Sequence, residues 1–285
     1  TVSGIGAEVG LKNARPTVVA PVADSPAAKA GLRPKDEIVL IDGQDTSGLA
    51  LDEAAGKIRG PAGFGVKLTI VRNNGAPFEV TITRAVITVA SVKSEMKPGG
   101  IGYIQLTRFG PDTSAKMRQA ADELAGRGAR RIILDMRNNP GGYLDAAVAV
   151  AGEFLDQKVV VEQRRDDRTI DKLTAPAGGK LVGLPTIVLI NGGSASASEI
   201  VAGALQDHGA ARVLGEKSFG KGSVQEVADL HGGANLKVTV AHWFTPKGKN
   251  IDKEGIKPDM EVKLEPADYD AGRDPQLDRA LELLK

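Results

Sequence analysis

Short runs in which apolar and polar residues alternate fill the first 84 positions of the chain. They predict β-strands at residues 17–20, 37–41, 66–71 and 78–82, with turn signals between them. Two helices are expected among these strands. Ser25, Pro26 and Gly31 supply an N-cap, a first-turn proline and a terminating glycine for the first, and residues 51–59 carry an apolar helical face for the second. Residues 1–84 therefore predict a compact β-rich domain.

From residue 101 the pattern changes to strands that alternate with longer helical stretches. Charges and Pro98-Gly99-Gly100 mark residues 91–100 as a linker-like segment, so the domain boundary is expected near 85 to 100 and the second domain over 85–285. This order of elements is typical of an α/β core. The expected strands are 101–106, 131–135, 159–163, 185–190, a strand near 213, 222–227 and 235–244, and the expected helices are 112–126, 144–154, 196–206 and 275–285, the last within a closing segment at 266–285.

Composition narrows the class of protein. Charged residues make up 26% and hydrophobic residues 41% of the 285 residues, which is typical of a folded globular protein of about two domains. The 37 basic and 36 acidic residues nearly cancel, so nucleic acid is a poor candidate partner. The absence of cysteine excludes disulfides and thiolate catalysis. No apolar run reaches the roughly 20 residues that span a bilayer, and the start at Thr1 suggests a processed form whose export signal or anchor was removed.

The string NGGSASASEI, residues 191–200, joins a buried-looking strand to a helix. Its small residues favour a sharp turn that exposes a hydroxyl at a helix N-terminus, where free N–H groups can stabilise an oxyanion. Ser196 would then be a nucleophile. Ser196 and Glu199 fit a capping box equally well, and on this string alone the capping interpretation is favoured.

A nucleophilic serine needs a base, and the three histidines (His208, His231 and His242) lie in no catalytic motif, which favours surface or packing roles. A lysine can serve where burial or neighbouring positive charge lets its amine lose a proton. Lys221 is the strongest candidate, because Gly220 and Gly222 permit close approach of the backbone and Gln225 could orient the amine. The alternative is a glycine-flanked surface loop.

A second strand-to-loop junction, at residues 132–144, carries Asp135, Arg137, Asn138, Asn139, Pro140, Gly141 and Gly142. Glycine N–H groups there could complete an oxyanion hole. A phosphate-binding loop is the competitor, but the GxGxxG and GxxxxGK[ST] strings are absent. An ordinary tight turn remains open.

As a set, these strings resemble the carboxyl-terminal processing proteases, also called tail-specific proteases, over nearly the whole chain. That family pairs a serine in NxGSASASE with a lysine in FGKGxxQ, and both strings are present here. The resemblance implies Ser196 as nucleophile, Lys221 as general base and Gln225 as the assisting residue. The DxRxNPGG loop implies that Gly142, with Gly141 the weaker alternative, joins Ala197 in the oxyanion hole. FTPKGKNIDKEGIKPD at 244–259 supports the assignment without adding a catalytic residue.

The opening SGIGAEV and the string at residues 18–45 resemble the PDZ domains of the same proteases. In such domains a glycine loop binds a terminal carboxylate while the peptide adds as a strand. The matching loop is Gly4, Ile5 and Gly6, although these residues could serve only as a turn. Arg59 could pair with a substrate carboxylate or the protease domain, or simply be solvated.

The resemblance implies a crotonase-like (ClpP-like) α/β protease core beside the PDZ domain, and a serine endopeptidase that cleaves proteins near exposed C-terminal tails without a metal or organic cofactor. It also implies a bacterial periplasmic or other extracytoplasmic location, and it raises a homo-oligomer, an adaptor protein and a membrane anchor outside this chain. Two rivals stay open: a catalytically silent scaffold that binds C-termini, and an acyl-transfer or hydratase enzyme, since crotonase-like folds host such chemistry.

Overall fold

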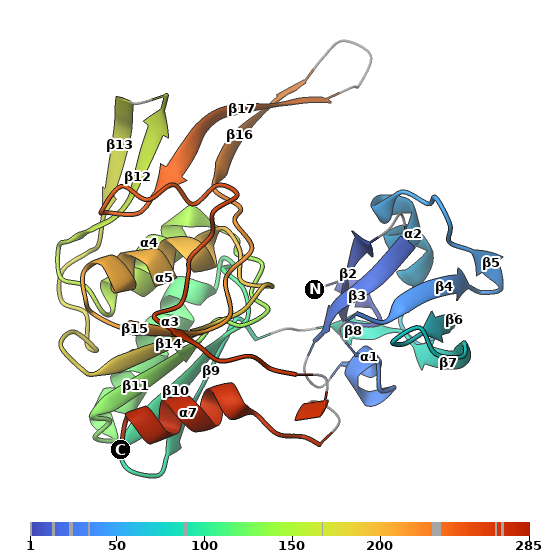
Figure 1. The fold of residues 1–285 in the computed structure, drawn as a ribbon, viewed down its shortest axis with the longest axis horizontal. Helices are drawn as coiled ribbons and strands as arrows, with labels where there is room; N and C mark the ends of the chain where they lie inside the picture. The colour runs from blue at the N-terminus through green and yellow to red at the C-terminus, as the bar shows by residue number, and fades with distance from the viewer. Residues whose placement is uncertain are drawn as a thin grey trace. The chain divides into compact units, whose positions relative to one another are not determined.

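The structure, a computed structural model, divides into two compact units, residues 1–89 and 90–285, which are described separately (Figure 1). The described residues are 2–12, 15–22, 25–33, 35–87, 90–166, 168–229, 235–265, 267–268 and 271–285.

The first unit is a twisted antiparallel sheet with two helices. Its strand order is β2-β3-β4-β6-β7, a short β5 pairs with β4, and β1 pairs with β8 in a separate ribbon. Ser25 caps α1 as expected, because its Oγ accepts from the Ala28 N–H at 3.1 Å. Alternate residues of β6, among them Val66, Leu68 and Ile70, enter the core. The elements are β1 (Val2–Gly4), β2 (Ala7–Lys12), β3 (Arg15–Pro21), α1 (Pro26–Lys29), β4 (Glu37–Ile41), β5 (Gln44–Asp45), α2 (Leu51–Ile58), β6 (Gly65–Val71), β7 (Phe78–Thr83) and β8 (Ala85–Ile87).

The second unit is built on a six-stranded sheet of order β18-β15-β14-β11-β10-β9. All its neighbouring strands are parallel except β9 and β10. Its central strands are continuous apolar runs, typical of a sheet that is buried on both faces. The strands are β9 (Val92–Lys97), β10 (Ile101–Leu106), β11 (Arg131–Asp135), β14 (Thr186–Ile190), β15 (Arg212–Gly215) and β18 (Met260–Glu261).

Helices cover both faces of this sheet (Figure 1). Three of them, α3 (Thr113–Gly126), α4 (Leu144–Gly152) and α5 (Ala197–Asp207), enclose the larger apolar core on one face. On the other face α7 (Pro275–Leu283) packs against β14 and β15. The α/β class predicted from the order of strands and helices is confirmed.

The segment expected to be a linker is instead an edge strand. Val92–Lys97 forms β9, which pairs antiparallel with β10 in register Ile101↔Lys97 to Leu106↔Val92. The prediction was wrong because the charges at Lys93 and Glu95 alternate with Val92, Ser94 and Met96, and Val92 and Met96 pack against the core. Charged positions that alternate in this way mark the solvent face of an edge strand.

A second, four-stranded antiparallel sheet has the order β13-β12-β17-β16. Its strands are β12 (Val159–Arg165), β13 (Arg168–Thr174), β16 (Ser223–Asp229) and β17 (Asn235–Phe244). Only residues 242–244 of β17 pair with β12, so the rest of β16 and β17 forms a two-stranded ribbon (Figure 1).

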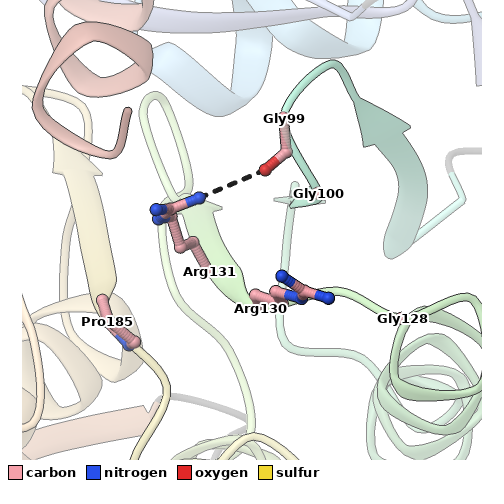
Figure 2. A pocket seen from close by; sticks show the side chains of 6 residues that line it. All are labelled: Gly99, Gly100, Gly128, Arg130, Arg131 and Pro185. Carbon is pink, nitrogen blue, oxygen red and sulfur yellow. Dashed lines mark hydrogen bonds between the residues drawn. The ribbon is translucent and has the colours of Figure 1, made fainter.

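Figure 2 shows a surface pocket lined by Gly99, Gly100, Gly128, Arg130, Arg131 and Pro185. Arg131 donates from Nη1 to the Gly99 carbonyl at 3.2 Å. These residues lie at the amino ends of β10, β11 and β14. The residues predicted for the nucleophile and the oxyanion hole instead follow the carboxyl ends of β11 and β14, at the opposite edge of the sheet.

Candidate active site

Two loops meet at the carboxyl edge of the central sheet. β11 ends at Asp135 and β14 at Ile190, and the two strands are parallel neighbours with Asp135 opposite Leu189. Because the carboxyl ends of parallel strands meet at one edge, the glycine loop (residues 136–142) and the serine turn (residues 191–196) lie together. This edge is where α/β sheets commonly place their sites.

Ser196 has a strained backbone at the N-cap of α5. Its φ of 54° and ψ of −114° lie outside the regions that non-glycine residues ordinarily occupy. Such a conformation costs about 1–3 kcal/mol and persists only where the surroundings enforce it. Ser196 and Glu199 also form the expected capping box, in which the Glu199 carboxylate accepts from the Ser196 N–H at 2.8 Å. Capping and an unusual, partly exposed serine therefore coexist at this turn.

The three serines of the string differ in what their hydroxyls do. Ser194 and Ser198 are fully buried, and their Oγ atoms donate to the carbonyls of Met136 at 2.8 Å and Asn139 at 2.9 Å. Ser196 is only partly buried. Two hydroxyls thus fasten the turn to the glycine loop, and the third is left accessible.

Further hydrogen bonds join the two loops. Asn138, with φ of 55°, donates from its N–H to Asn191 Oδ1 at 2.8 Å, and Asn191 Nδ2 donates back to Asn138 Oδ1 at 2.9 Å. The Asn139 carbonyl also accepts from the Ala195 N–H at 3.0 Å. These hydrogen bonds fix the glycine loop against the serine turn.

Gly141 lies directly against the serine turn. A Cβ on Gly141 would lie 2.8 Å from Ser196 Cβ and 2.9 Å from the Ala197 nitrogen, and its φ of 97° also requires glycine. A Cβ on Gly142 would lie 2.1 Å from the Phe109 carbonyl oxygen. The Gly141 N–H already donates to Asn139 Oδ1 at 2.9 Å. Within the described ranges the N–H groups of Gly142 and Ala197 have no hydrogen-bond partner.

The loop that carries Lys221 is attached to the same turn through a buried carboxylate. Glu199 has no exposed surface, and besides Ser196 it accepts from Ser218 Oγ at 2.6 Å, the Gly220 N–H at 2.6 Å and the Lys221 N–H at 2.9 Å. A buried charge of this kind is tolerated only when its oxygens are fully hydrogen-bonded. Glu199 therefore links the backbones of Ser196 and Lys221.

The glycines around Lys221 have a packing reason. Lys253 donates from its N–H to the Gly220 carbonyl at 2.8 Å. A Cβ on Gly220 would lie 2.9 Å from the Lys253 carbonyl carbon, and one on Gly222 would lie 2.2 Å from the Asp252 nitrogen. The string at 244–259, which had no assigned role in the sequence, thus supports the Lys221 loop.

The structure does not bring the two predicted catalytic side chains into contact. The Lys221 side chain is exposed, and in the described part of the chain its Nζ makes no hydrogen bond to Ser196 Oγ. The Gln225 backbone pairs with Thr239 in the ribbon, but its side chain lies outside the described atoms. His208 is a packing histidine whose Nε2 lies 2.7 Å from the Val159 carbonyl oxygen, and His242 lies 3.7 Å from Asp252. His231 lies outside the described residues.

In the first unit the predicted carboxylate loop is ordered by neighbouring backbone. The carbonyls of Ile5 and Gly6 accept from the N–H groups of Ala27 and Val22, and the Ile5 side chain is buried. Their own N–H groups have no partner among the described residues. Arg59 is exposed beside the loop, since its Cγ would lie 3.7 Å from a Cβ on Gly4.

Two other features are absent from the described residues. Three or more His, Cys, Asp or Glu side chains are nowhere grouped so as to hold a metal ion there. None of the described helices has the length and apolar character needed to cross a bilayer.

Comparisons with known proteins identify the family to which the chain belongs. The sequence profile of peptidase family S41 matches residues 100–262, and that of the PDZ domain matches residues 17–72. The carboxy-terminal processing protease CtpA of Bacillus subtilis is 39% identical, over 93% of this chain and 57% of its own length. The carboxyl-terminal-processing protease of Synechocystis is 41% identical, over 99% of this chain and 68% of its own length. The chain thus spans little more than half of the Bacillus relative.

A solved photosystem II D1 C-terminal processing protease superposes with a TM-score of 0.79 at 33% identity, over 92% of this chain and 72% of that one. An S41 protease from Bacteroides fragilis shares the fold, with a TM-score of 0.66 at 20% identity, over 99% of this chain and 83% of that one. The profile match covers more than half of the chain and the relatives cover nearly all of it, so the chain belongs to peptidase family S41 and carries a PDZ domain.

Proposed function

We propose that the protein is a serine endopeptidase that cleaves proteins near their C-termini, with Ser196 as nucleophile and Lys221 as general base. The observation that carries the proposal is the Ser196 turn. Of the serines at positions 194, 196 and 198, Ser196 alone is partly exposed, and its backbone is held at φ 54°. It adjoins the Ala197 N–H, which has no hydrogen-bond partner among the described residues. A sharp strand-to-helix turn beside free N–H groups suits attack on a carbonyl carbon.

The chemistry follows from these positions. Ser196 Oγ bonds to the carbonyl carbon of a substrate peptide while its proton passes to the neutral Lys221 amine. The N–H groups of Ala197 and Gly142 donate to the oxyanion that forms, and the Gly141 N–H is the weaker candidate because Asn139 already holds it. The C–N bond then breaks as the protonated Lys221 gives its proton to the leaving amine. Water, deprotonated by Lys221, releases the acyl group, and the proton returns to Ser196 Oγ.

Lys221 must move or be covered for this reaction to occur, because its side chain is exposed. Catalytic hydrogen bonds often tighten only in the complex with substrate. We expect the bound substrate strand to bury the amine, with Gln225 orienting it as a hydrogen-bond partner.

The PDZ unit would supply the tail specificity. In the loop of Gly4, Ile5 and Gly6, the N–H groups of Ile5 and Gly6 have no partner within the part of the chain that the structure describes, and Arg59 adds a positive charge beside them. Such a loop can bind a terminal carboxylate while the peptide pairs with the sheet edge. We propose that this unit binds the C-terminal tails of substrates or controls their access to the protease unit. We also propose that the protein works outside the cytoplasm. Any homo-oligomer, adaptor protein or membrane anchor would then serve the activity of the protease unit.

The test is intact-mass analysis of an unstructured protein with an apolar C-terminal tail after incubation with wild type, Ser196→Ala and Lys221→Ala. Lys217→Ala is the matched control, since Lys217 is an exposed lysine four residues before Lys221. We expect products that end near the C-terminus from wild type and Lys217→Ala only. Hydrolysis that persists in pure Lys221→Ala would overturn the Ser–Lys assignment, and cuts spread along the substrate would overturn tail direction.

A further inference from the structure

Arg137 lies at the start of the glycine loop, in a largely buried ionic cluster. Its Nε donates to Asp135 Oδ1 at 3.0 Å, and its Nη2 donates to Asp135 Oδ2 at 2.6 Å. The Arg137 and Asp135 side chains are 12% and 4% exposed. The Tyr103 hydroxyl also donates to Asp135, at 2.8 Å. Asp135 and Arg137, the charged residues of the DxR part of the loop motif, are therefore bonded to each other. The proposed reaction assigns no role to either of them.

The other edge of the Arg137 guanidinium contacts the C-terminal segment. Nη1 donates to Asp274 Oδ1 and Nη2 to Asp274 Oδ2, both at 2.8 Å, in the bidentate geometry that makes arginine–carboxylate pairs directional. Nη1 also donates to Gln276 Oε1 at 3.0 Å. Asp274 is the N-cap of α7, because its Oδ1 accepts from the Leu277 N–H at 3.0 Å. The beginning of α7 is thus fixed to residue 137.

Only residues 138–141 separate Arg137 from Gly142, the proposed oxyanion donor, so a fixed Arg137 restricts where the backbone of the glycine loop can lie. Asn138 is held by its amide pair with Asn191, Asn139 donates from Nδ2 to the Leu106 carbonyl at 2.7 Å, and Gly141 and Gly142 follow. The apolar cluster under α7 includes Ile133 of β11, and Arg131, at the amino end of β11, donates from Nη2 to the Lys285 carbonyl at 3.2 Å. At the carboxyl end of β11, where the glycine loop begins, the contact with the C-terminal segment is that of Arg137 with Asp274 and Gln276.

We propose that Arg137 and Asp274 are positioning residues that form a clamp, through which the segment from 274 to 285 holds the glycine loop in the geometry that stabilises the oxyanion. This inference rests on the proposed function, because it gives a purpose to the loop only if Gly142 and Ala197 act on a tetrahedral intermediate. Neither residue of the clamp touches the substrate. Both act by fixing the backbone that does.

The test uses the full chain with Asp274→Asn. Asparagine retains the helix cap but loses the charge, and its amide nitrogen meets a donor of Arg137. Asp278→Asn is the matched control, since Asp278 is exposed in the first turn of the same helix and contributes to no ion pair among the described residues. Arg137→Lys, which keeps the charge but not the fork, is the second variant.

Two readouts separate positioning from simple stability. Peptide hydrolysis below the unfolding temperature should show kcat lowered about tenfold to hundredfold in Asp274→Asn with KM little changed, because a misplaced donor weakens only the transition state. Hydrogen–deuterium exchange of the peptide spanning 136–143 should be faster in Asp274→Asn and Arg137→Lys than in wild type and Asp278→Asn. The exchange measurement does not depend on turnover or on how stable the variant is above assay temperature.

Wild-type kcat and wild-type exchange at 136–143 in folded Asp274→Asn or Arg137→Lys would overturn the clamp. Equal effects in Asp278→Asn would overturn it as well, by showing a general effect of helix charge. If Ser196→Ala is inactive while Asp274→Asn is fully active, the clamp alone fails. If Ser196→Ala retains full activity, the proposed function fails instead.

Discussion

At the scale of single residues, one buried carboxylate joins the loop that carries Ser196 to the loop that carries Lys221. Glu199 accepts from the backbones of Ser196, Gly220 and Lys221 and from the Ser218 hydroxyl. The sequence string predicted its capping bond, since that partner is three residues away. It could not predict the bonds to Gly220 and Lys221, 21 and 22 residues further on, because local patterns carry no information about which loop packs over a helix terminus. The only sign in the sequence that Glu199 has further partners was a charged residue at the start of an apolar helix.

We predict that Glu199→Gln destabilises the fold by about 2–4 kcal/mol and lowers kcat strongly. The amide places an N–H donor where donors already converge, so at least one buried N–H or hydroxyl loses its acceptor. Denaturant unfolding and peptide hydrolysis measure the two effects.

Glu261→Gln is the control for that variant, because Glu261 is an exposed carboxylate on β18. The same change of charge there should alter neither quantity. Unchanged stability in Glu199→Gln would contradict the role of Glu199 as the joint between the loops.

At the scale of elements, the hydrophobic periodicity predicted the helices and the central strands of the sheet. The strands that it missed lie at the edges of the two sheets. Residues 92–97 read as a linker because charges dominate their solvent face, yet they form β9. β13 and the two-residue β18 were not expected, since their pairing depends on partners distant in the sequence. The closing helix was predicted from its apolar spacing. Its ionic attachment through Asp274 was not, because a single aspartate before a proline reads only as a cap.

Because Asp274 is an ionisable group, the stability that its contact with Arg137 contributes depends on pH. Burial raises the pKa of Asp274, but the hydrogen bonds and charge of Arg137 outweigh it, so that its pKa lies below the ordinary value of 3.8. Asp135 faces the same guanidinium, and burial with the Asp135 charge raises the pKa of Tyr103, so this phenol stays neutral. A depressed carboxyl pKa contributes stability that is present above the unfolded-state value and is lost as the pH falls through the folded-state value.

The melting temperature of wild type should therefore exceed that of Asp274→Asn at neutral pH, and the difference should shrink as the pH falls below about 4. Thermal unfolding of both proteins from pH 7 to pH 2.5 measures it. A difference that stays constant over this range would show that Asp274 contributes by something other than its charge.

At the scale of the whole molecule, the chain consists of two units with separate cores. Residues 17–72 match the PDZ profile and residues 100–262 the peptidase profile, and the strings that resemble each family lie within or beside those spans. The natural substrate could not be read from the sequence, because a PDZ loop contacts a tail mainly through backbone groups that every sequence possesses.

Arg59 provides a side-chain test of this unit. We predict that Arg59→Ala, made in the Ser196→Ala background to prevent the expected turnover, weakens binding of an apolar peptide with a free C-terminal carboxylate about twofold to fivefold, as expected for one exposed ion pair. The amidated peptide should bind poorly and show no dependence on Arg59. Fluorescence anisotropy measures both affinities.

Lys29→Ala is the matched control, since Lys29 is an exposed lysine on α1 of the same unit. Equal weakening by Lys29→Ala would indicate a general electrostatic effect. Equal affinity of wild type for the acid and amide peptides would contradict carboxylate recognition altogether.

The central claim is that Ser196 is the nucleophile, and covalent labelling tests it most directly. The protein is treated with a peptidyl fluorophosphonate, and the peptide spanning 181–212 is mapped by tandem mass spectrometry. We expect one adduct, on Ser196, with none on the buried Ser194 or Ser198 and strongly slowed labelling in Lys221→Ala. An adduct on another serine, or labelling at the wild-type rate in Lys221→Ala, would contradict the account.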